Sequence, residues 1–268
     1  MLETFTESGK AKRRVVVKIQ AVFFDIGGTI HVQDATPEQD VRYANLVHEL
    51  LEEHGIEAGT PHDLLQKIDC GAKKYKKYVE EHLVELPGEQ IWTEFMLPGV
   101  PGLEPISEQL SFLFDRYRKQ ITPRKGLHEM LETLRAQGYQ LGVISNIMSR
   151  TFVPRILEEY GIAEYFQTLT LSSECGIRKP RREIFDLALK EAGVDRQAAC
   201  YVGDTISRDV RGARWAEWPL MIQIDNPRTY HKDQAFRDAG YEPDVRIQNL
   251  MEIIPVLQDD HKKRYHLT

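Results

Sequence analysis

Short apolar runs that alternate with segments of helical periodicity constrain the fold of this chain more than any other feature. Strands are expected at 18–24, 139–145, 166–172, 200–204, 219–224 and 244–247. Helices are expected at 126–137, 150–160, 181–192, 206–216 and 250–257. Short apolar strands separated by amphipathic helices predict a parallel sheet that is covered by helices on both faces. The expected fold class is therefore α/β, with a Rossmann-like parallel-sheet core.

Two helix starts follow the first predicted strand. Thr36 and Thr60 are N-cap residue types, and each precedes a proline in the first helical turn. Gln39 and Asp63 stand three residues further on, where a polar side chain can complete a capping box. Apolar residues then recur at helical spacing, so both positions are predicted to begin amphipathic helices.

The stretch between the first strand and the alternating pattern is predicted to be helical throughout. The second helix is expected to run towards Leu86, a third covers 106–120, and no strand is expected between about 34 and 120. This divides the chain into an N-terminal extension (1–18), an α/β core (19–33 and 121–268) and an all-helical insert (34–120).

The composition excludes several classes of function. The chain has 268 residues and a formal net charge of -6, whereas a general nucleic-acid binder needs a basic face. No apolar run reaches about 18 residues, the length that a membrane-spanning helix requires. Cys70, Cys175 and Cys200 are widely spaced and contain no CxxC pair, which suits a reducing compartment. We expect a cytoplasmic monomer or homodimer that binds neither nucleic acid nor membrane.

Charged side chains follow two of the predicted strands. Asp25 ends the first strand, Asp204 ends another, and Asp209 lies about one helical turn beyond Asp204. The carboxyl ends of parallel strands meet at one edge of a sheet, so these carboxylates should converge there. They would repel one another unless a divalent cation or a lysine lay between them, and Lys179 is the candidate lysine.

Ser145 and Asn146 follow a third strand end and precede a predicted helix. A hydroxyl, an amide and backbone N–H groups at such a position suit a phosphoryl oxygen. Any one of these strand-end residues taken alone is more often a local cap paired with a surface lysine. Their occurrence together, in order on successive strands, favours a single site.

Four segments carry a resemblance to a known family: DIGGT (25–29), VISN (143–146), GIRKP (176–180) and GDTISRD (203–209). In this order they resemble the motifs of the haloacid dehalogenase (HAD) superfamily of hydrolases. One subclass of that superfamily carries a helical cap directly after the first motif, where the insert lies here. The resemblance covers roughly residues 19–258.

The resemblance implies a phosphoryl-transfer role for four residues. Asp25 would be the nucleophile that attacks phosphorus and forms an aspartyl-phosphate. Ser145 and Asn146 would bind the transferring phosphoryl group. Lys179 would neutralise that group and orient Asp25. The implied partner is a small phosphate ester.

The resemblance also implies a Mg²⁺ site. Its ligands would be Asp25, Asp204 and the backbone carbonyl of Gly27, with Asp209 holding either the water shell of the metal or Lys179. A carbonyl ligand needs no side chain, so a glycine at position 27 is compatible with the metal. Mg²⁺ and the lysine would both act on the charge of the transferring group.

Gly27 stands where most phosphatases of this superfamily carry a second aspartate, which protonates the leaving group. General acid–base catalysis contributes roughly 10²–10⁴-fold to rates, so glycine should slow poor leaving groups most. Three alternatives stay open besides a Mg²⁺-dependent phosphatase. They are a metal-independent haloacid dehalogenase, a phosphonatase-like C–P hydrolase that would use a lysine from the run 73–77, and a non-catalytic ligand-binding protein. His31 lies nearby and is expected to be an exposed hinge residue, with a proton-shuttle role as the alternative.

Overall fold

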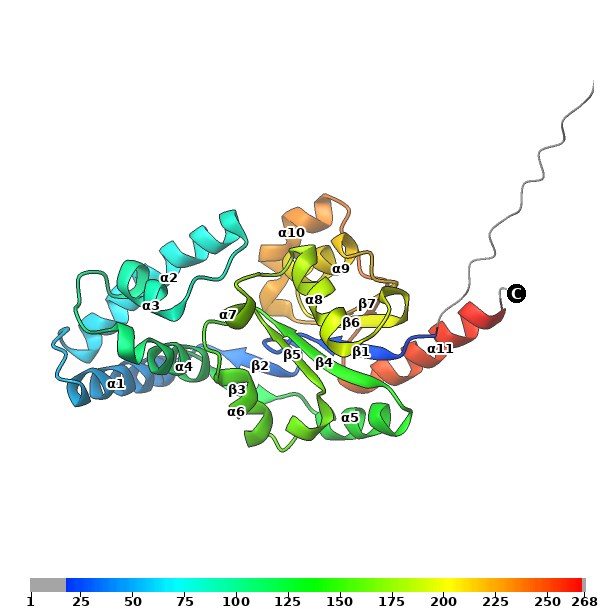
Figure 1. Cartoon of the computed structure of the whole chain (residues 1–268), viewed down its shortest axis with the longest axis horizontal. Coiled ribbons are helices and arrows are strands. Elements are labelled where there is room, and N and C mark those ends of the chain that lie inside the picture. The colour runs from blue at the N-terminus through cyan, green and yellow to red at the C-terminus, as the bar shows by residue number, and fades with distance from the viewer. Residues whose placement is uncertain (1–17, 267–268) are drawn as a thin grey trace, which may run out of the picture.

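A six-stranded parallel sheet forms the core of the protein (Figure 1). The computed structural model describes residues 18–266, so most of the predicted N-terminal extension lies outside the described residues. The strand order is β5-β4-β1-β6-β7-β8. The strands are β1 (Ala21–Phe24), β4 (Gln140–Ser145), β5 (Thr168–Leu171), β6 (Ala199–Gly203), β7 (Leu220–Ile224) and β8 (Val245–Ile247). The predicted α/β fold class is confirmed.

Successive strand residues point to opposite faces of this sheet. Both faces are apolar, and helices cover both of them. Val22 and Phe24 pack with one set of helices, and Ala21 and Phe23 pack with another. The first set is α5 (Leu127–Ala136), α6 (Phe152–Glu159) and the C-terminal η7 (Leu250–Glu252) and α11 (Ile253–His266). The second set is α8 (Arg182–Ala192), the π-helix η5 (Ile206–Val210) and α9 (Arg211–Trp215). The strands are buried from both sides, which explains their near-continuous apolar sequences.

The shorter remaining elements of the core lie in its connections. They are η3 (Ala163–Tyr165), α7 (Ser172–Cys175), η4 (Arg196–Ala198), η6 (Pro227–Thr229) and α10 (Tyr230–Asp238). Sequence periodicity did not predict α10, in which only Asp233 is buried. Asp233 accepts hydrogen bonds from the backbone N–H groups of Ile206 (2.7 Å) and Ser207 (3.1 Å), at the start of η5.

The insert forms a separate helical lobe with its own hydrophobic core (Figure 1). Its elements are α1 (Pro37–Glu53), α2 (Pro61–His82), α3 (Gly88–Gln90), η1 (Ile91–Met96), η2 (Glu104–Ile106) and α4 (Ser107–Tyr117). Both N-caps are as predicted, and Asp63 completes a capping box with Thr60. The predicted box at Gln39 is wrong, because its side chain donates to the carbonyl of Tyr117 (2.7 Å) instead. The domain boundaries themselves stay a prediction.

The two ends of the insert pair with each other, which the sequence did not predict. β2 (His31–Asp34) and β3 (Gln120–Pro123) form an antiparallel two-stranded sheet. The insert also touches the core elsewhere: α2 ends at His82 rather than near Leu86, and Val84 makes an antiparallel β-bridge to Ile177. The helical lobe is therefore joined to the core both at the β2–β3 sheet and beside the segment that carries Lys179.

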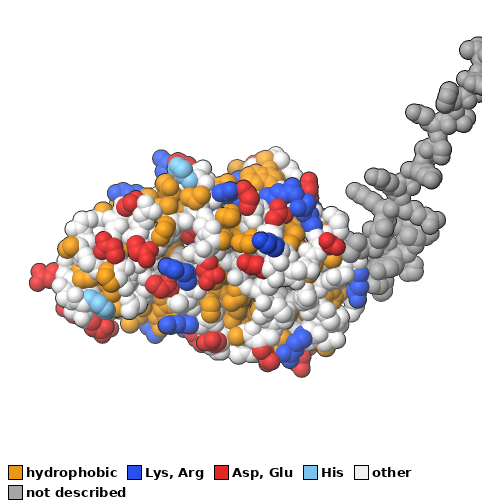
Figure 2. Space-filling view, viewed as in Figure 1, with side chains coloured by type: hydrophobic (Ala, Val, Ile, Leu, Met, Phe, Trp, Pro, Cys, Tyr) orange, Lys and Arg blue, Asp and Glu red, His pale blue; other side chains and the backbone are white. Residues whose placement is uncertain are grey.

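On the face shown in Figure 2, acidic and basic side chains lie interspersed rather than in one field. Within residues 18–266, none of the helices combines the length and the apolar character that crossing a membrane demands.

Candidate active site

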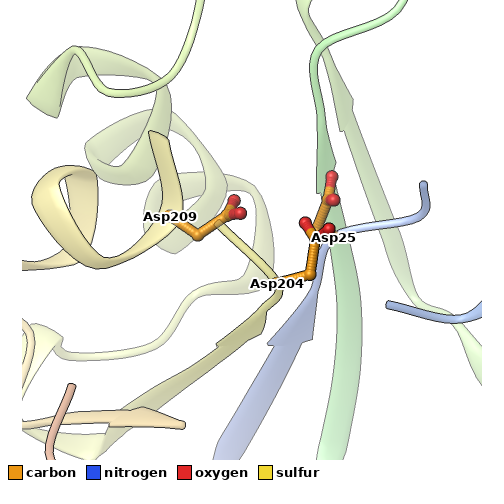
Figure 3. A group of neighbouring side chains, drawn as sticks. All are labelled: Asp25, Asp204 and Asp209. Atoms are coloured by element: carbon orange, nitrogen blue, oxygen red, sulfur yellow. The ribbon is translucent and has the colours of Figure 1, made fainter. Parts of the chain in front are cut away.

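The ends of three neighbouring strands bring the predicted site residues together. Asp25 directly follows β1, Ser145 is the last residue of β4, and Asp204 directly follows β6. The backbone N–H of Asp25 donates to the carbonyl of Val202 (2.9 Å), which fixes the end of β1 against β6. One carboxylate oxygen from each of Asp25, Asp204 and Asp209 lies within 4.8 Å of the others, and Figure 3 shows the three side chains facing one another.

Lys179 lies between two of these carboxylates. Its Nζ donates to Asp25 Oδ1 (2.7 Å), to Asp209 Oδ1 (2.8 Å) and to the hydroxyl of Tyr201 (2.7 Å), and the residue is only 3% exposed. Three acceptors saturate an ammonium group, so the lysine head has one defined position. The sequence anticipated both carboxylates but not Tyr201.

Asn146 holds the backbone of this lysine. Its Oδ1 accepts from the N–H of Lys179 (2.8 Å), and its Nδ2 donates to the carbonyl of Lys179 (3.0 Å). The side-chain amide is thereby engaged, which leaves the backbone of Asn146 as its means of contacting a ligand. Ser145 is buried beside it. The phosphate-binding role of both residues stays a prediction.

Asp209 is held as a charged group. Its Oδ2 accepts from the backbone N–H (2.9 Å) and from the hydroxyl (2.5 Å) of Thr205. Burial opposes ionisation, but Lys179 and Arg208 outweigh it and lower the pKa of Asp209 below its usual value. This carboxylate therefore acts as a permanent partner for Lys179.

The pKa values of Asp25 and Asp204 are shifted in the opposite direction from that of Asp209. Burial raises the pKa of Asp25, against the attraction of Lys179. Burial, together with the charges of Asp209 and Asp25, raises the pKa of Asp204 to about 7. Arg208 opposes this rise at Asp204 but does not outweigh it, so two buried carboxylates that resist ionisation lie side by side.

The donor set around Asp204 fits a divalent cation. Asp204 Oδ2 accepts from Asn226 Nδ2 (2.7 Å), whereas Oδ1 is buried and has no hydrogen-bond partner among the described residues. An unsatisfied carboxylate oxygen is costly in a protein interior, and hard oxygen ligands of this kind suit Mg²⁺. The residues present therefore fit the predicted metal, and the carbonyl of Gly27 as a ligand stays a prediction.

Two glycines follow Asp25, and they differ in what they permit. Gly28 has a φ of +91°, and a Cβ on it would lie 2.1 Å from Asp204 Oδ2, so glycine is required at this position. Arg124 donates to the carbonyl of Gly28 from Nη2 (2.7 Å) and Nε (3.1 Å), which fixes this turn. Gly27 has no such constraint, because a Cβ there would meet only the end of the Gln33 side chain.

The expectation for His31 was wrong. The imidazole is fully buried and packs edge-on against Phe152 and Tyr160. Burial, assisted by Arg116, lowers the pKa of His31 to about 4. A neutral imidazole at physiological pH has no spare proton to deliver, which argues against the shuttle role.

Asn226 was also missed, although a signal for it exists. It lies two residues past the end of β7 and contacts Asp204. Polar residues just past the carboxyl ends of β1, β4 and β6 were expected to meet at one edge of the sheet. The same reasoning applied to the end of β7 identifies Asn226.

The lysine run on α2 lies on a solvated helix face. Lys76 and Lys77 are exposed and pair with Glu80 (3.6 Å) and Glu81 (3.8 Å) at i,i+4 spacing. Lys73 and Lys74 are exposed as well. A lysine that forms a Schiff base needs a desolvated environment, so this run gives no support to phosphonatase-like chemistry.

Comparisons with known proteins agree with this geometry. The chain is 24% identical to a glyceraldehyde 3-phosphate phosphatase from Methanopyrus kandleri over 242 residues, which span 90% of this chain and 98% of the relative. Its fold is similar to a HAD phosphatase from Thermococcus onnurineus (TM-score 0.58, 22% identity, 89% and 98% of the two chains). It is equally similar to a 2-haloacid dehalogenase from Pseudomonas syringae pv. tomato (TM-score 0.59, 24% identity, 90% and 99%).

These two structural neighbours share the fold and carry different chemistry in their names, so the fold alone does not select a reaction. The family profile of the haloacid dehalogenase-like hydrolases matches residues 19–217, which include all four motif segments and the strand ends that carry the carboxylates. The chain therefore belongs to the haloacid dehalogenase-like hydrolase family, and it is a hydrolase.

Proposed function

We propose that the protein is a Mg²⁺-dependent phosphatase that hydrolyses a small phosphorylated metabolite through an aspartyl-phosphate on Asp25. The observation that carries this proposal is the unpartnered, buried Oδ1 of Asp204 beside two further carboxylates. Dehalogenation does not need a metal, and this cluster has its simplest explanation around a cation. The phosphatase relative matched over nearly its whole length supports the same choice.

Asp25 and Lys179 would perform the displacement. Asp25 Oδ1 is held at 2.7 Å by Lys179 Nζ, which leaves the other oxygen of the carboxylate to attack phosphorus. Lys179 would neutralise the transferring phosphoryl group while Asp209 keeps the ammonium in place. Bound Mg²⁺, held by Asp25, Asp204 and the Gly27 carbonyl, would supply further positive charge to the phosphoryl oxygens.

Phosphate release from 4-nitrophenyl phosphate tests the proposal. We expect turnover with Mg²⁺, loss of turnover on chelation, and loss in Asp25→Asn, which keeps the shape of the side chain but is a poor nucleophile. Beryllofluoride with Mg²⁺ should trap an adduct on Asp25 in the native chain only. Absence of both turnover and adduct would exclude the phosphatase, and metal-independent chloride release from 2-chloropropionate would establish the dehalogenase instead.

A further inference from the structure

The space above Gly27 is filled by a side chain from another strand. A Cβ at position 27 would lie 2.9 Å from Gln33 Nε2 and 3.5 Å from Gln33 Cδ. The arrangement arises because Gly27 makes a β-bridge to His31, and the N–H of Gly28 donates to the carbonyl of His31 (2.8 Å). β2 therefore passes directly over the turn, and Gln33 lies where a side chain at position 27 would project.

Gln33 in turn contacts Lys119, the residue before the β3 segment. Lys119 Nζ donates to Gln33 Oε1 (3.3 Å), and Gln33 Nε2 lies 3.5 Å from His31 Nε2. Of these three side chains, the amide has no acidic proton, and the buried imidazole is neutral at physiological pH because its pKa is about 4. Lys119 is the one that carries a transferable proton.

Lys119 is exposed, and its contact with Gln33 places its ammonium beside the side chain that covers Gly27. The groups that act on its ammonium are Lys232 on α10, Arg208 on η5, Arg118 beside it in the chain, and Asp204 of the carboxylate cluster. Partial desolvation and the three cations lower the pKa of Lys119, against the opposing effect of Asp204. A lysine with a lowered pKa gives up its proton more readily near neutral pH.

We propose that Lys119, positioned by Gln33, is the leaving-group acid of this enzyme and replaces the carboxylate that is absent at Gly27. The inference rests on the proposed phosphatase function. As Asp25 attacks phosphorus, the bond from phosphorus to the ester oxygen breaks, and the proton on Lys119 Nζ passes to that oxygen to release an alcohol. In the second step water attacks the aspartyl-phosphate, its proton returns to Nζ, and phosphate and the Asp25 carboxylate are released.

Leaving-group dependence tests this role. We expect Lys119→Met to lower kcat about 10²-fold for ethyl phosphate, whose alkoxide needs a proton, and less than about 3-fold for 4-nitrophenyl phosphate. Lys119→Arg separates charge from proton transfer, because arginine stays protonated. Lys119→Arg should keep the KM of the native enzyme, and its kcat on ethyl phosphate should fall as much as that of Lys119→Met. Gln33→Leu, which removes the contact with Lys119 and keeps the lysine itself, should show a smaller loss with the same selectivity.

The pH profile adds a readout that a purely structural role would not change. The decline of kcat for ethyl phosphate at high pH should disappear in Lys119→Met, and Lys190→Met on the exposed side of α8 should behave as the native chain. Equal losses on both substrates, or full ethyl phosphate activity in Lys119→Arg, would overturn the inference and leave the phosphatase intact. Failure of the native chain to hydrolyse either substrate would overturn both.

Discussion

Two regions of the site are built in different ways. One is its floor, formed by Asp25, Lys179 and Asp209, and the other is its hinge side, formed by His31, Gln33 and Lys119 where β2 and β3 pair. On the floor, Asp25, Lys179 and Asp209 are almost fully buried and are joined by hydrogen bonds of 2.7–2.8 Å. On the hinge side, Gln33 and Lys119 meet at 3.3 Å near solvent, over a glycine. The floor has one arrangement that satisfies its charges, whereas the Gln33–Lys119 contact leaves the lysine exposed, so we expect its substitution to affect stability little.

This difference indicates how a hydrolase of this kind can change one role without losing the others. Asp25 and Lys179 depend on each other electrostatically, so a change in either one disturbs both. Position 27 has only the flexible amide of Gln33 above it. A role that a side chain at position 27 would perform can therefore be taken over by a side chain that is distant in sequence.

The largest expected effect comes from breaking the floor. Lys179→Met should lower kcat/KM for 4-nitrophenyl phosphate by about 10³-fold or more, because it removes charge stabilisation of the transferring group. It should also reduce the free energy of unfolding by about 3 kcal/mol, because Asp25 and Asp209 lose their buried partner. Phosphate release and urea unfolding measure the two effects. Lys190→Met is the control, and an equal loss there would mean that Lys179 has no special position.

The sequence predicted the sheet and the floor because both follow from local patterns. Apolar runs of strand length identify the sheet, and the strand-end rule then places Asp25, Ser145 and Asp204 at one edge. Each prediction needs only the residues of one segment. The α/β fold is confirmed, and the catalytic roles stay predictions that the geometry supports.

The hinge side could not be predicted in this way. β2 and β3 are short and polar, and each is a strand only because the other is there to pair with it. His31 likewise resembles an exposed polar residue in the sequence, whereas the folded chain buries it and packs it against Phe152 and Tyr160. Gln33 and Lys119 belong to no motif, because their contact exists only once the insert has folded and brought its two ends together.

A medium-sized effect should come from the buried imidazole on the hinge side. The pKa of His31 is about 4 in the folded protein and near 6.5 when the residue is exposed. Between these values the unfolded chain binds the proton and the native one does not, so stability falls as the pH drops through this range. The loss should reach about 3 kcal/mol at pH 4.

Urea unfolding at pH 7 and pH 4 measures this dependence. His31→Gln, which replaces the imidazole with a neutral polar group, should flatten the pH dependence by about that amount, whereas the exposed His128→Gln should leave it unchanged. Parallel curves for the native chain and His31→Gln would show that the folded protein protonates His31 without cost. The hinge side would then be less rigid than its burial implies.

The smallest effect, and the sharpest comparison of the two regions, comes from restoring the absent carboxylate. The backbone of Gly27 lies outside the left-handed region, and only the flexible end of Gln33 must shift, so Gly27→Asp should fold normally. In the native background it should raise kcat on ethyl phosphate less than about 10-fold, because Lys119 already supplies the proton. In the Lys119→Met background the same change should raise kcat on ethyl phosphate by about 10²-fold.

Such non-additivity is expected of two groups that perform one step, whereas independent groups would give equal gains in both backgrounds. Gly27→Asn is the matched control, because it has the same shape and cannot transfer a proton. If it rescued Lys119→Met as well as the aspartate did, the gain would come from filling the space above the turn. Proton transfer to the leaving group would then not be what the hinge side contributes.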